Sequence, residues 1–129
     1  MLVLDASAAV DLLARTTRGV RVAEHLARDD VAAPELLHVE VLSALWRLVR
    51  AGELTEAAAT TAAARMRAMP VLRVRHERLT DQAWALRHRV RIADAFYLGC
   101  ARLLGGALIT TDGRLARAPL PGLSVTFLG

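Results

Sequence analysis

The sequence predicts an α/β fold of three layers, in which a central parallel sheet of about five short strands is flanked by helices. Three observations support this prediction. Short apolar runs recur along the chain, helical periodicity follows each of the early ones, and no linker, repeat or low-complexity run divides the 129 residues. Strands that alternate with helices are typical of a parallel sheet covered on both faces. Residues 1–129 are therefore expected to form one domain.

The N-terminal segment carries the first expected strand. Residues 2–4 form an unbroken apolar run, as expected for a strand buried on both faces, and Asp5 ends that run. Ser7 is placed to cap a helix that begins at Ala8. Ligands bind beyond the carboxyl ends of the strands in open α/β sheets, so Asp5 is a candidate site residue.

The middle of the chain carries two further strands between helices. The expected elements are a loop at 15–19, a helix near 20–28, a strand at 31–33, a helix at 35–50 with Pro34 in its first turn, a helix up to Met69 that Thr55 caps, and a strand at 71–75. Apolar and basic residues alternate at 71–75, which favours a position near the sheet edge.

Glu40 lies within the expected helix at 35–50. It comes three residues after Leu37 and four before Ala44, two members of the apolar stripe, so it projects from the core side of the helix or its margin. A buried carboxylate without a partner is costly. Glu40 is therefore either an internal partner of an arginine or part of a functional site, and the residues alone leave both open.

The C-terminal third contains two more acids in suggestive places. A helix around residues 79–86 is followed by a basic cluster, and the next helix spans residues 92–104 with Asp94 in its first turn. An ordinary helix-capping role for Asp94 is the alternative to a functional one. Residues 107–112 repeat the design of the N-terminus, because an apolar run ends in small hydroxyl residues and Asp112. A turn, a loop through Pro119 and Pro121, and a last strand at 123–127 complete the chain.

These acids are expected to converge. Right-handed crossovers place the ends of the first and fourth strands at one edge of the sheet, so Asp5 and Asp112 are neighbours if those strands are adjacent. Glu40 and Asp94 could complete the cluster. At ~5 Å and an effective dielectric constant of about 20, each carboxylate pair repels by roughly 3 kcal/mol. Four carboxylates together therefore need a divalent cation or a shared proton.

Composition excludes several classes of function. The net charge of +4 suits a polyanionic partner without demonstrating one, and all 17 basic residues are arginines. The absence of lysine excludes a P-loop and any lysine-dependent mechanism. No apolar run approaches the ~18 residues of a membrane span, and no basic region precedes the N-terminal apolar run, so a cytoplasmic protein is expected. Cys100 is the only cysteine, so a disulfide within the chain is excluded.

In their order and context these motifs resemble the PIN domain, and specifically the VapC-type toxins of bacterial toxin–antitoxin pairs. The resemblance rests on residues 2–7 around Asp5, on Glu40 in the helix after the second strand, on Asp94 within Ile-Ala-Asp-Ala-Phe-Tyr-Leu-Gly and on Asp112 within Thr-Thr-Asp-Gly-Arg-Leu-Ala-Arg. It spans essentially the whole chain. The resemblance implies a PIN-like fold, a ribonuclease whose acids hold magnesium or manganese, a homodimer, and inhibition by a small VapB-like antitoxin.

The expected reaction is hydrolysis of an RNA phosphodiester by the toxin of a type II toxin–antitoxin pair. The expected catalytic and metal-binding residues are Asp5, Glu40, Asp94 and Asp112. Carboxylates without histidine or cysteine at ligand spacing favour one or two Mg²⁺ or Mn²⁺ ions over zinc. Ser7 and Thr110 would orient a carboxylate or a metal-bound water, and arginines would hold the RNA backbone.

Three alternatives to this expectation differ in the residues that they require. A phosphoacceptor receiver domain would need a lysine on a late strand, and the chain has none. A haloacid-dehalogenase-like phosphatase would need Asp-x-Asp after the first strand, where this chain has Asp5-Ala-Ser7. A non-catalytic RNA- or partner-binding module with merely structural acids remains open, and divalent-dependent cleavage would separate it from a nuclease.

Overall fold

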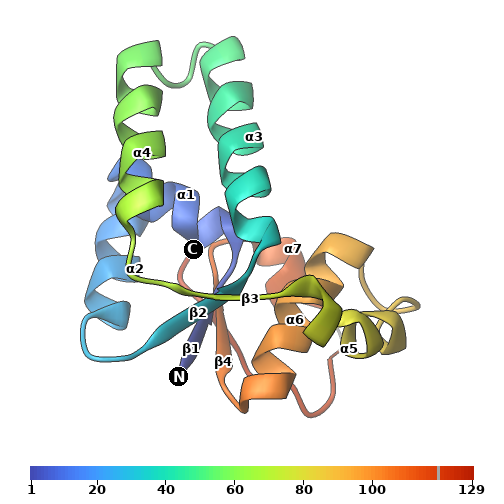
Figure 1. Cartoon of the computed structure of the whole chain (residues 1–129). Helices are drawn as coiled ribbons and strands as arrows, with labels where there is room; N and C mark the ends of the chain where they lie inside the picture. The colour runs from blue at the N-terminus through green and yellow to red at the C-terminus, as the bar shows by residue number, and fades with distance from the viewer. Residues whose placement is uncertain (119) are drawn as a thin grey trace.

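A single parallel sheet organises the computed structural model, which describes residues 1–118 and 120–129 (Figure 1). Pro119, in the expected C-terminal loop, lies outside the described residues. The sheet has the strand order β3-β2-β1-β4-β5, and every neighbouring pair is parallel. The strands are β1 (Leu2–Leu4), β2 (Val31–Pro34), β3 (Leu72–Val74), β4 (Ala107–Thr110) and β5 (Val125–Phe127). The predicted α/β fold with about five short parallel strands is confirmed.

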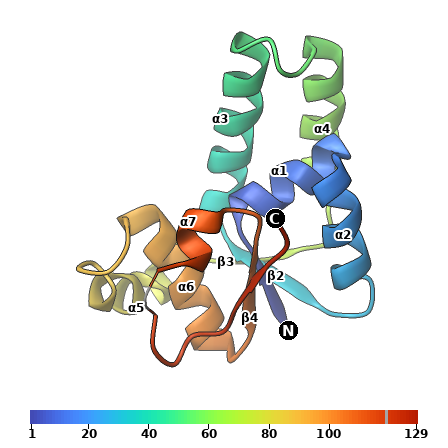
Figure 2. The same cartoon turned by 180° about the vertical axis from the view of Figure 1, so that it is seen from behind.

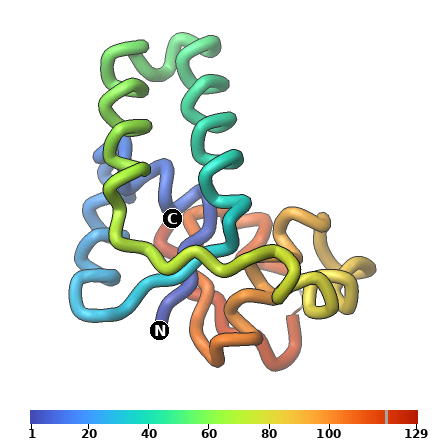
Figure 3. The backbone as a smooth tube through the Cα atoms, viewed as in Figure 1, coloured from blue at the N-terminus to red at the C-terminus, as the bar shows by residue number. Residues whose placement is uncertain are grey.

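Helices flank this sheet on both sides. They are α1 (Ala6–Ala14), α2 (Thr17–Leu26), α3 (Leu36–Arg50), α4 (Glu56–Ala68), the 3₁₀ helix η1 (His76–Arg78), α5 (Thr80–Ala85), α6 (Ile92–Leu104) and α7 (Gly113–Ala116). Helices α1 and α2 lie to one side of the strands and α5 and α6 to the other, as the front and back views show (Figures 1 and 2). Helices α3 and α4 form an antiparallel pair that projects beyond the sheet, which the backbone trace makes plain (Figure 3).

Strand β1 lies at the centre of the sheet and brings the two ends of the sequence together. Val3 pairs with Ala32 of β2 on one side and with Leu108 of β4 on the other. The backbone N–H of Asp5 donates to the carbonyl of Ile109 at 3.1 Å, which continues the ladder beyond β1. The chain connects β1 to β2 on one side and returns to β4 on the other, so the ends of β1 and β4 form the topological switch point of the sheet.

The first two helices begin earlier than predicted. Asp5, and not Ser7, is the N-cap of α1, because its extended backbone allows Oδ1 to accept a hydrogen bond from the N–H of Ala8 at 2.9 Å. The helix therefore starts at Ala6. Likewise Thr16 caps α2 by accepting from the N–H of Gly19 at 3.0 Å. The predicted loop at 15–19 and the predicted start of the second helix near residue 20 are wrong for this reason.

The prediction that Pro34 starts the third helix is also wrong. Pro34 is the last residue of β2, opposite Val74 of β3, and α3 begins two residues later. Although proline has no N–H to donate, the N–H of Glu35 continues the pairing by donating to the carbonyl of Val74 at 3.1 Å.

Other expectations in the middle of the chain are met, with one difference. Thr55 caps α4 by accepting from the N–H of Ala58 at 3.1 Å, and β3 lies at the sheet edge. Helix α5 ends at Ala85, so the basic cluster at 87–91 lies in the turn before α6.

The core lies between the sheet and its helices. Its largest fully buried side chains include Leu4, Leu37, Leu98, Leu108 and Ile109. Burial of such side chains stabilises the fold by roughly 1.5 to 3 kcal/mol each relative to exposure. Within residues 1–118 and 120–129, the structure contains no helix with the length and apolarity that a membrane crossing requires.

Candidate active site

A cavity of about 680 Å³ opens where β1 and β4 end. The four predicted acids all line it: Asp5 at the start of α1, Glu40 on α3, Asp94 on α6 and Asp112 at the start of α7. Residues that are far apart in the sequence therefore share one cavity. Its position is the one at which open α/β sheets bind ligands.

Asp5 is almost fully buried and held by three hydrogen bonds. Its Oδ1 accepts from the N–H of Ala8 at 2.9 Å and from the Ser7 hydroxyl at 2.8 Å, and its Oδ2 accepts from the Thr110 hydroxyl at 2.6 Å. Burial raises the pKa of Asp5 to about 6, although these hydrogen bonds favour the ionised form and oppose the shift. The hydrogen bonds fix the orientation of the carboxylate, but burial destabilises its ionised form near neutral pH.

Ser7 and Thr110 also connect the two strand ends. The Ser7 hydroxyl accepts from the N–H of Thr111 at 3.1 Å, and the Thr110 hydroxyl accepts from the N–H of Asp112 at 3.0 Å. Each hydroxyl therefore donates to Asp5 and accepts from the backbone that follows β4. This pattern fixes the distance between the loops that carry Asp5 and Asp112.

Asp94 and Asp112 share one arginine. Oδ2 of Asp94 and Oδ2 of Asp112 each lie 3.0 Å from Nη2 of Arg114, and Oδ2 of Asp94 also accepts from Nε of Arg91 at 3.3 Å. Asp94 lies in the first turn of α6, where the helix dipole favours a carboxylate, and in the described residues its side chain bonds to Arg91 and Arg114 rather than to a backbone N–H of that helix. Oδ1 of Asp112 caps α7 by accepting from the N–H groups of Arg114 and Leu115 at 2.9 and 3.4 Å.

Glu40 is half-buried and lies beside an unsatisfied hydroxyl. No arginine in the described part of the chain forms an ion pair with Glu40. Within that part of the chain, the alternative that Glu40 is the internal partner of an arginine is therefore wrong. The hydroxyl of Tyr97 is buried and has no hydrogen-bond partner in the same part of the structure. Burial, then the negative charge of Glu40 and the proximity of its carboxylate to the hydroxyl, raise the pKa of Tyr97 far above its usual range.

The sequence-based reasoning missed Asp11, Thr111 and Arg114. Asp11 is buried at the cavity wall, where Oδ1 accepts from Thr16 and Oδ2 accepts from Thr111, both at 2.7 Å. Its position one helical turn after Ser7 places both on the same face of α1, and that spacing could have identified it. Arg114 carries no comparable signal, because arginines are frequent throughout the chain.

The donor chemistry of the cavity fits a hard divalent cation. Carboxylate and hydroxyl oxygens line it, and no histidine or cysteine does. In the described residues, however, no group of three or more acids, histidines or cysteines is close enough to hold one ion. The carboxylates line one cavity but do not surround a single point within it. The guanidinium of Arg114 lies between Asp94 and Asp112 and supplies a positive charge there.

Arginines surround the acids at the cavity wall. Arg18, Arg47 and Arg91 contribute to its lining, and Arg18 lies 3.5 Å from Oδ2 of Asp11. Guanidinium groups recognise phosphate through charge-assisted, paired hydrogen bonds. The cavity therefore combines acidic groups inside with basic groups around them, an arrangement suited to a cation and a polyanion together.

Comparison with known proteins identifies relatives of this chain. A family model described as the PIN domain matches residues 2–120. Ribonuclease VapC3 of Mycobacterium tuberculosis is 48% identical over 117 residues, which cover 90% of this chain and 85% of the relative. Ribonuclease VapC12 of the same species is 37% identical over 118 residues, covering 92% of each chain.

A solved structure supports the fold independently. A toxin–antitoxin complex from Klebsiella pneumoniae contains a chain that superposes with a TM-score of 0.71, covering 100% of this chain and 98% of that one. The two sequences are 18% identical, so this likeness bears on the fold alone.

Proposed function

The chain belongs to the PIN-domain family and is of the VapC type, and on that premise we propose that it is an endoribonuclease that depends on Mg²⁺ or Mn²⁺ and acts as the toxin of a type II toxin–antitoxin pair. Its relatives are named as ribonucleases, and they share up to 48% identity over nearly the whole chain. The proposed reaction is hydrolysis of an RNA phosphodiester bond.

One observation carries the proposal: Asp5, Glu40, Asp94 and Asp112 line a single cavity that arginines also line. Phosphodiester hydrolysis requires charge stabilisation at the attacked phosphate and a hold on the flanking backbone. Acidic groups can supply the first by binding a cation, and guanidinium groups can supply the second. A purely structural acid cluster would not need an open cavity.

The metal would be held by pairs of these carboxylates together with water. Mg²⁺ retains several waters and is commonly bound through one or two carboxylates plus substrate phosphates, which agrees with acids that face one cavity without forming a cage. When bound, such an ion lowers the pKa of a coordinated water and stabilises negative charge on the phosphate. Asp5, Asp94 and Asp112, with Glu40 nearby, are the proposed ligands.

The chain's own groups perform the rest of the work. Ser7 and Thr110 fix the orientation of Asp5, because each donates a hydrogen bond to a different oxygen of its carboxylate. With a pKa of about 6, Asp5 is mostly ionised at pH 7.5 and mostly protonated at pH 5. Arg18 and Arg47 would bind backbone phosphates at the cavity wall, contacts that carry no sequence information.

Cleavage assays on the purified protein test the proposal. RNA is incubated with the parent protein in Mg²⁺, in Mn²⁺ and in chelator, and with Asp5→Asn in each condition. We expect cleavage that requires the metal and that falls at least 100-fold in Asp5→Asn. Without the Asp5 carboxylate the cation would no longer be held in place to stabilise negative charge on the phosphate, a stabilisation worth several kcal/mol. Glu24→Gln, an exposed acid on α2, is the matched control and should cleave like the parent. Undiminished cleavage by a folded Asp5→Asn protein would overturn the assignment.

The non-catalytic alternative has one observation in its favour. Asp94 and Asp112 pair with arginines of the same chain, as structural acids do. An RNA-binding or partner-binding module would retain RNA affinity in Asp5→Asn and would show no cleavage in any metal condition. Binding and cleavage measured on the same preparations therefore separate the two functions.

We also propose a small VapB-like antitoxin and a second copy of the chain as protein partners. Helix α3 presents Val39, Leu42 and Trp46 along one exposed face, where they are 63%, 48% and 54% exposed. Exposed apolar side chains at helical spacing are typical of protein contact surfaces. Light scattering of the purified chain tests the homodimer, and co-purification with the product of an adjacent small reading frame tests the antitoxin. A monodisperse monomer would overturn the first, and failure of the two products to associate the second.

A further inference from the structure

Arg114 occupies an unusual position between two of the acids. Its Nη2 lies 3.0 Å from Oδ2 of Asp94 and 3.0 Å from Oδ2 of Asp112, so a single nitrogen bridges two carboxylates from different elements. Arg91 contacts only Asp94, at 3.3 Å. Arg114 is therefore the arginine in the described residues that joins two of the proposed metal ligands.

We propose that Arg114 is a built-in competitor for the divalent cation: its guanidinium neutralises Asp94 and Asp112 in the metal-free protein and must leave them when the metal binds. The inference rests on the proposed function, because it concerns the same metal site. It adds a residue that sets the affinity of that site for metal.

Geometry makes the exchange possible. The oxygen atoms that accept from Arg114 belong to two carboxylates that line the cavity, so a cation bound by the same atoms would displace the guanidinium. The Arg114 side chain is 51% exposed, so water can solvate its guanidinium once it leaves the two acids. A long arginine side chain with one half in water can move aside without disturbing the core.

The different hydrogen bonds of the two Asp112 oxygens favour this role of Arg114 over a purely structural one. Asp112 already has a structural task, because Oδ1 caps α7 through the N–H groups of Arg114 and Leu115. Its other oxygen, Oδ2, is the one that the guanidinium neutralises. Loss of the guanidinium would therefore leave the cap intact, would free Oδ2 of Asp112, and would leave Oδ2 of Asp94 with the longer contact to Arg91 alone, at 3.3 Å.

Binding of Mn²⁺ alone, measured by calorimetry and by the loss of the free-ion paramagnetic resonance signal, tests the proposal without any assay of activity. We expect Arg114→Gln to bind Mn²⁺ about fivefold to tenfold more tightly than the parent, since two half-exposed ion pairs no longer compete. Arg114→Lys should lie between them, because an ammonium group keeps the charge but lacks the planar fork of donors.

Arg18→Gln is the matched control for a general effect of charge. Arg18 lines the same cavity and is 53% exposed, but it pairs with Asp11 and not with Asp94 or Asp112. Its removal should change Mn²⁺ affinity less than twofold. An equal increase in Arg18→Gln and Arg114→Gln, or no increase in Arg114→Gln, would overturn the inference.

A second measurement follows Arg114 directly and does not depend on a variant that folds. In ¹⁵N spectra of the metal-free parent, the bridging Nη group should give a resolved, slowly rotating signal, and saturating Mg²⁺ should merge that signal with those of exposed arginines. An Nη signal unaffected by bound Mg²⁺ would contradict the exchange. If the parent binds neither Mn²⁺ nor Mg²⁺, the proposed metal site itself is overturned, which is a different result from binding that is indifferent to Arg114.

Discussion

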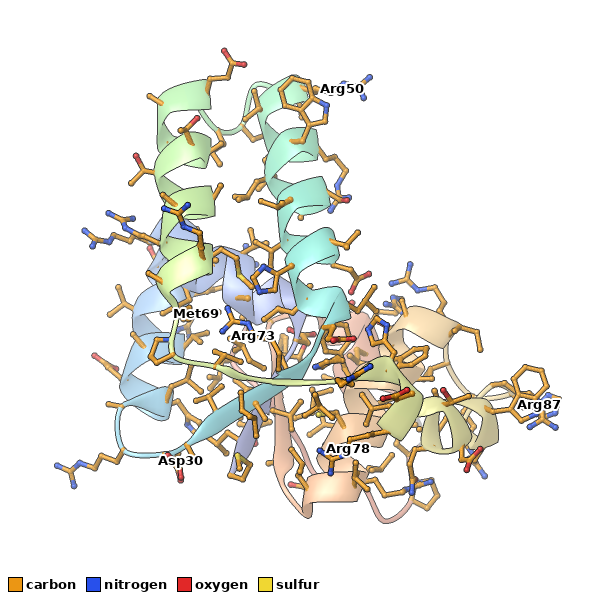
Figure 4. The ribbon with its side chains drawn as sticks, in the orientation of Figure 1. Asp30, Arg50, Met69, Arg73, Arg78 and Arg87 are labelled. Carbon is orange, nitrogen blue, oxygen red and sulfur yellow. The ribbon has the colours of Figure 1, made fainter. Side chains whose placement is uncertain are left out.

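Arg73 lies in the middle of β3, where its guanidinium donates from Nε to Nε2 of His38 at 2.9 Å, and from its Nη groups to three carbonyls at the end of α4 and in the segment that leads into β3. Figure 4 shows Arg73 directed toward Met69 at the base of α4. At the ends of β1 and β4, by contrast, Asp5 is buried at the cost of a raised pKa and the Tyr97 hydroxyl has no partner in the described residues. The β2–β3 half of the sheet uses these polar groups to join helices, and the β1–β4 half places its polar groups at the wall of a cavity.

The β2–β3 half also fixes the start of α3. The N–H of Leu36 donates to Nε2 of His76 at 2.8 Å, and the N–H of His76 lies 3.3 Å from Oε2 of Glu35. The His76 ring contacts Phe96 of α6, with ring centroids 4.9 Å apart. Because α3 carries Glu40, the well-bonded half supports the position of an acid in the open half. The bonds that join helices and the acidic cavity therefore belong to different strands of one sheet.

The largest expected effect concerns the pH dependence of stability at Asp5. The pKa of Asp5 is about 6 in the folded protein and 3.8 in the unfolded reference, so protonation stabilises the fold fully below pH 3.8, and this stabilisation is lost as pH rises through 6. In chelator, the stability of Asp5→Asn relative to the parent should therefore rise by about 2 to 3 kcal/mol between pH 4 and pH 7.5.

Urea denaturation of both proteins at several pH values measures that change. Comparing the same pair at two pH values removes the constant effect of altered hydrogen bonds to Ser7 and Thr110. Glu24→Gln controls for the loss of one negative charge at an exposed position. A stability difference that stays constant from pH 4 to pH 7.5 would show that burial of Asp5 carries no such cost.

The next effect, of about 2 kcal/mol, concerns Arg73. Arg73→Met should destabilise the protein by that amount, because it removes the donor to His38 and one donor from each of three carbonyls, two of which keep a backbone donor. Arg75→Met is the matched control on the same segment, since Arg75 makes one exposed ion pair with Glu77 and should cost at most ~0.5 kcal/mol. Denaturant midpoints decide the matter, and equal losses in both variants would erase the contrast between the two halves.

A smaller effect is expected for Asp94 and magnesium. Mg²⁺ at ten times its dissociation constant should stabilise the parent by about 1.4 kcal/mol, and Asp94→Asn by much less, because the ion binds only the folded protein. In chelator the substitution should cost at most ~1 kcal/mol, since the partners of Asp94 are exposed arginines. Thermal melts with chelator and with Mg²⁺ test this. A variant destabilised equally in both conditions would mean that Asp94 is structural.

The smallest effect concerns Tyr97. A buried hydroxyl without a hydrogen-bond partner is unfavourable, so Tyr97→Phe should leave the protein equally stable or more stable, by up to ~1 kcal/mol. Leu98→Ala, at a neighbouring fully buried position, should instead cost about 2 to 5 kcal/mol. A clear destabilisation by Tyr97→Phe would reveal a bond that this hydroxyl makes in solution.

The sequence was sufficient to predict the sheet and its acids because their signals are local. Asp5 and Asp112 each end an apolar run, and the alternation of strands with helices implies that the runs are parallel. Right-handed connections then bring the two ends to one edge. Glu40 and Asp94 were found from helical position alone, and all four acids do line one cavity.

What the sequence could not supply depends on contacts between distant residues. Asp5 and Ser7 can both cap a helix, and only the extended backbone at Asp5 decides between them. The bond between His38 and Arg73 joins residues 35 positions apart. The guanidinium of Arg114 reaches Asp94 across 20 residues, and no local pattern distinguishes it from the other 16 arginines. Partner choice among equivalent side chains is a property of the folded chain.

The central place of β1 bears on the order of events during synthesis of the chain. Residues 2–4 are synthesised well before their register partners at 107–109. A nascent chain can pair β1 with β2 early, but Asp5 meets Thr110 and Asp112 only after the segment that carries β4 has been made. Pairing over such sequence distances is intrinsically slow. A chain in which β4 has not yet docked therefore has no assembled acidic cavity.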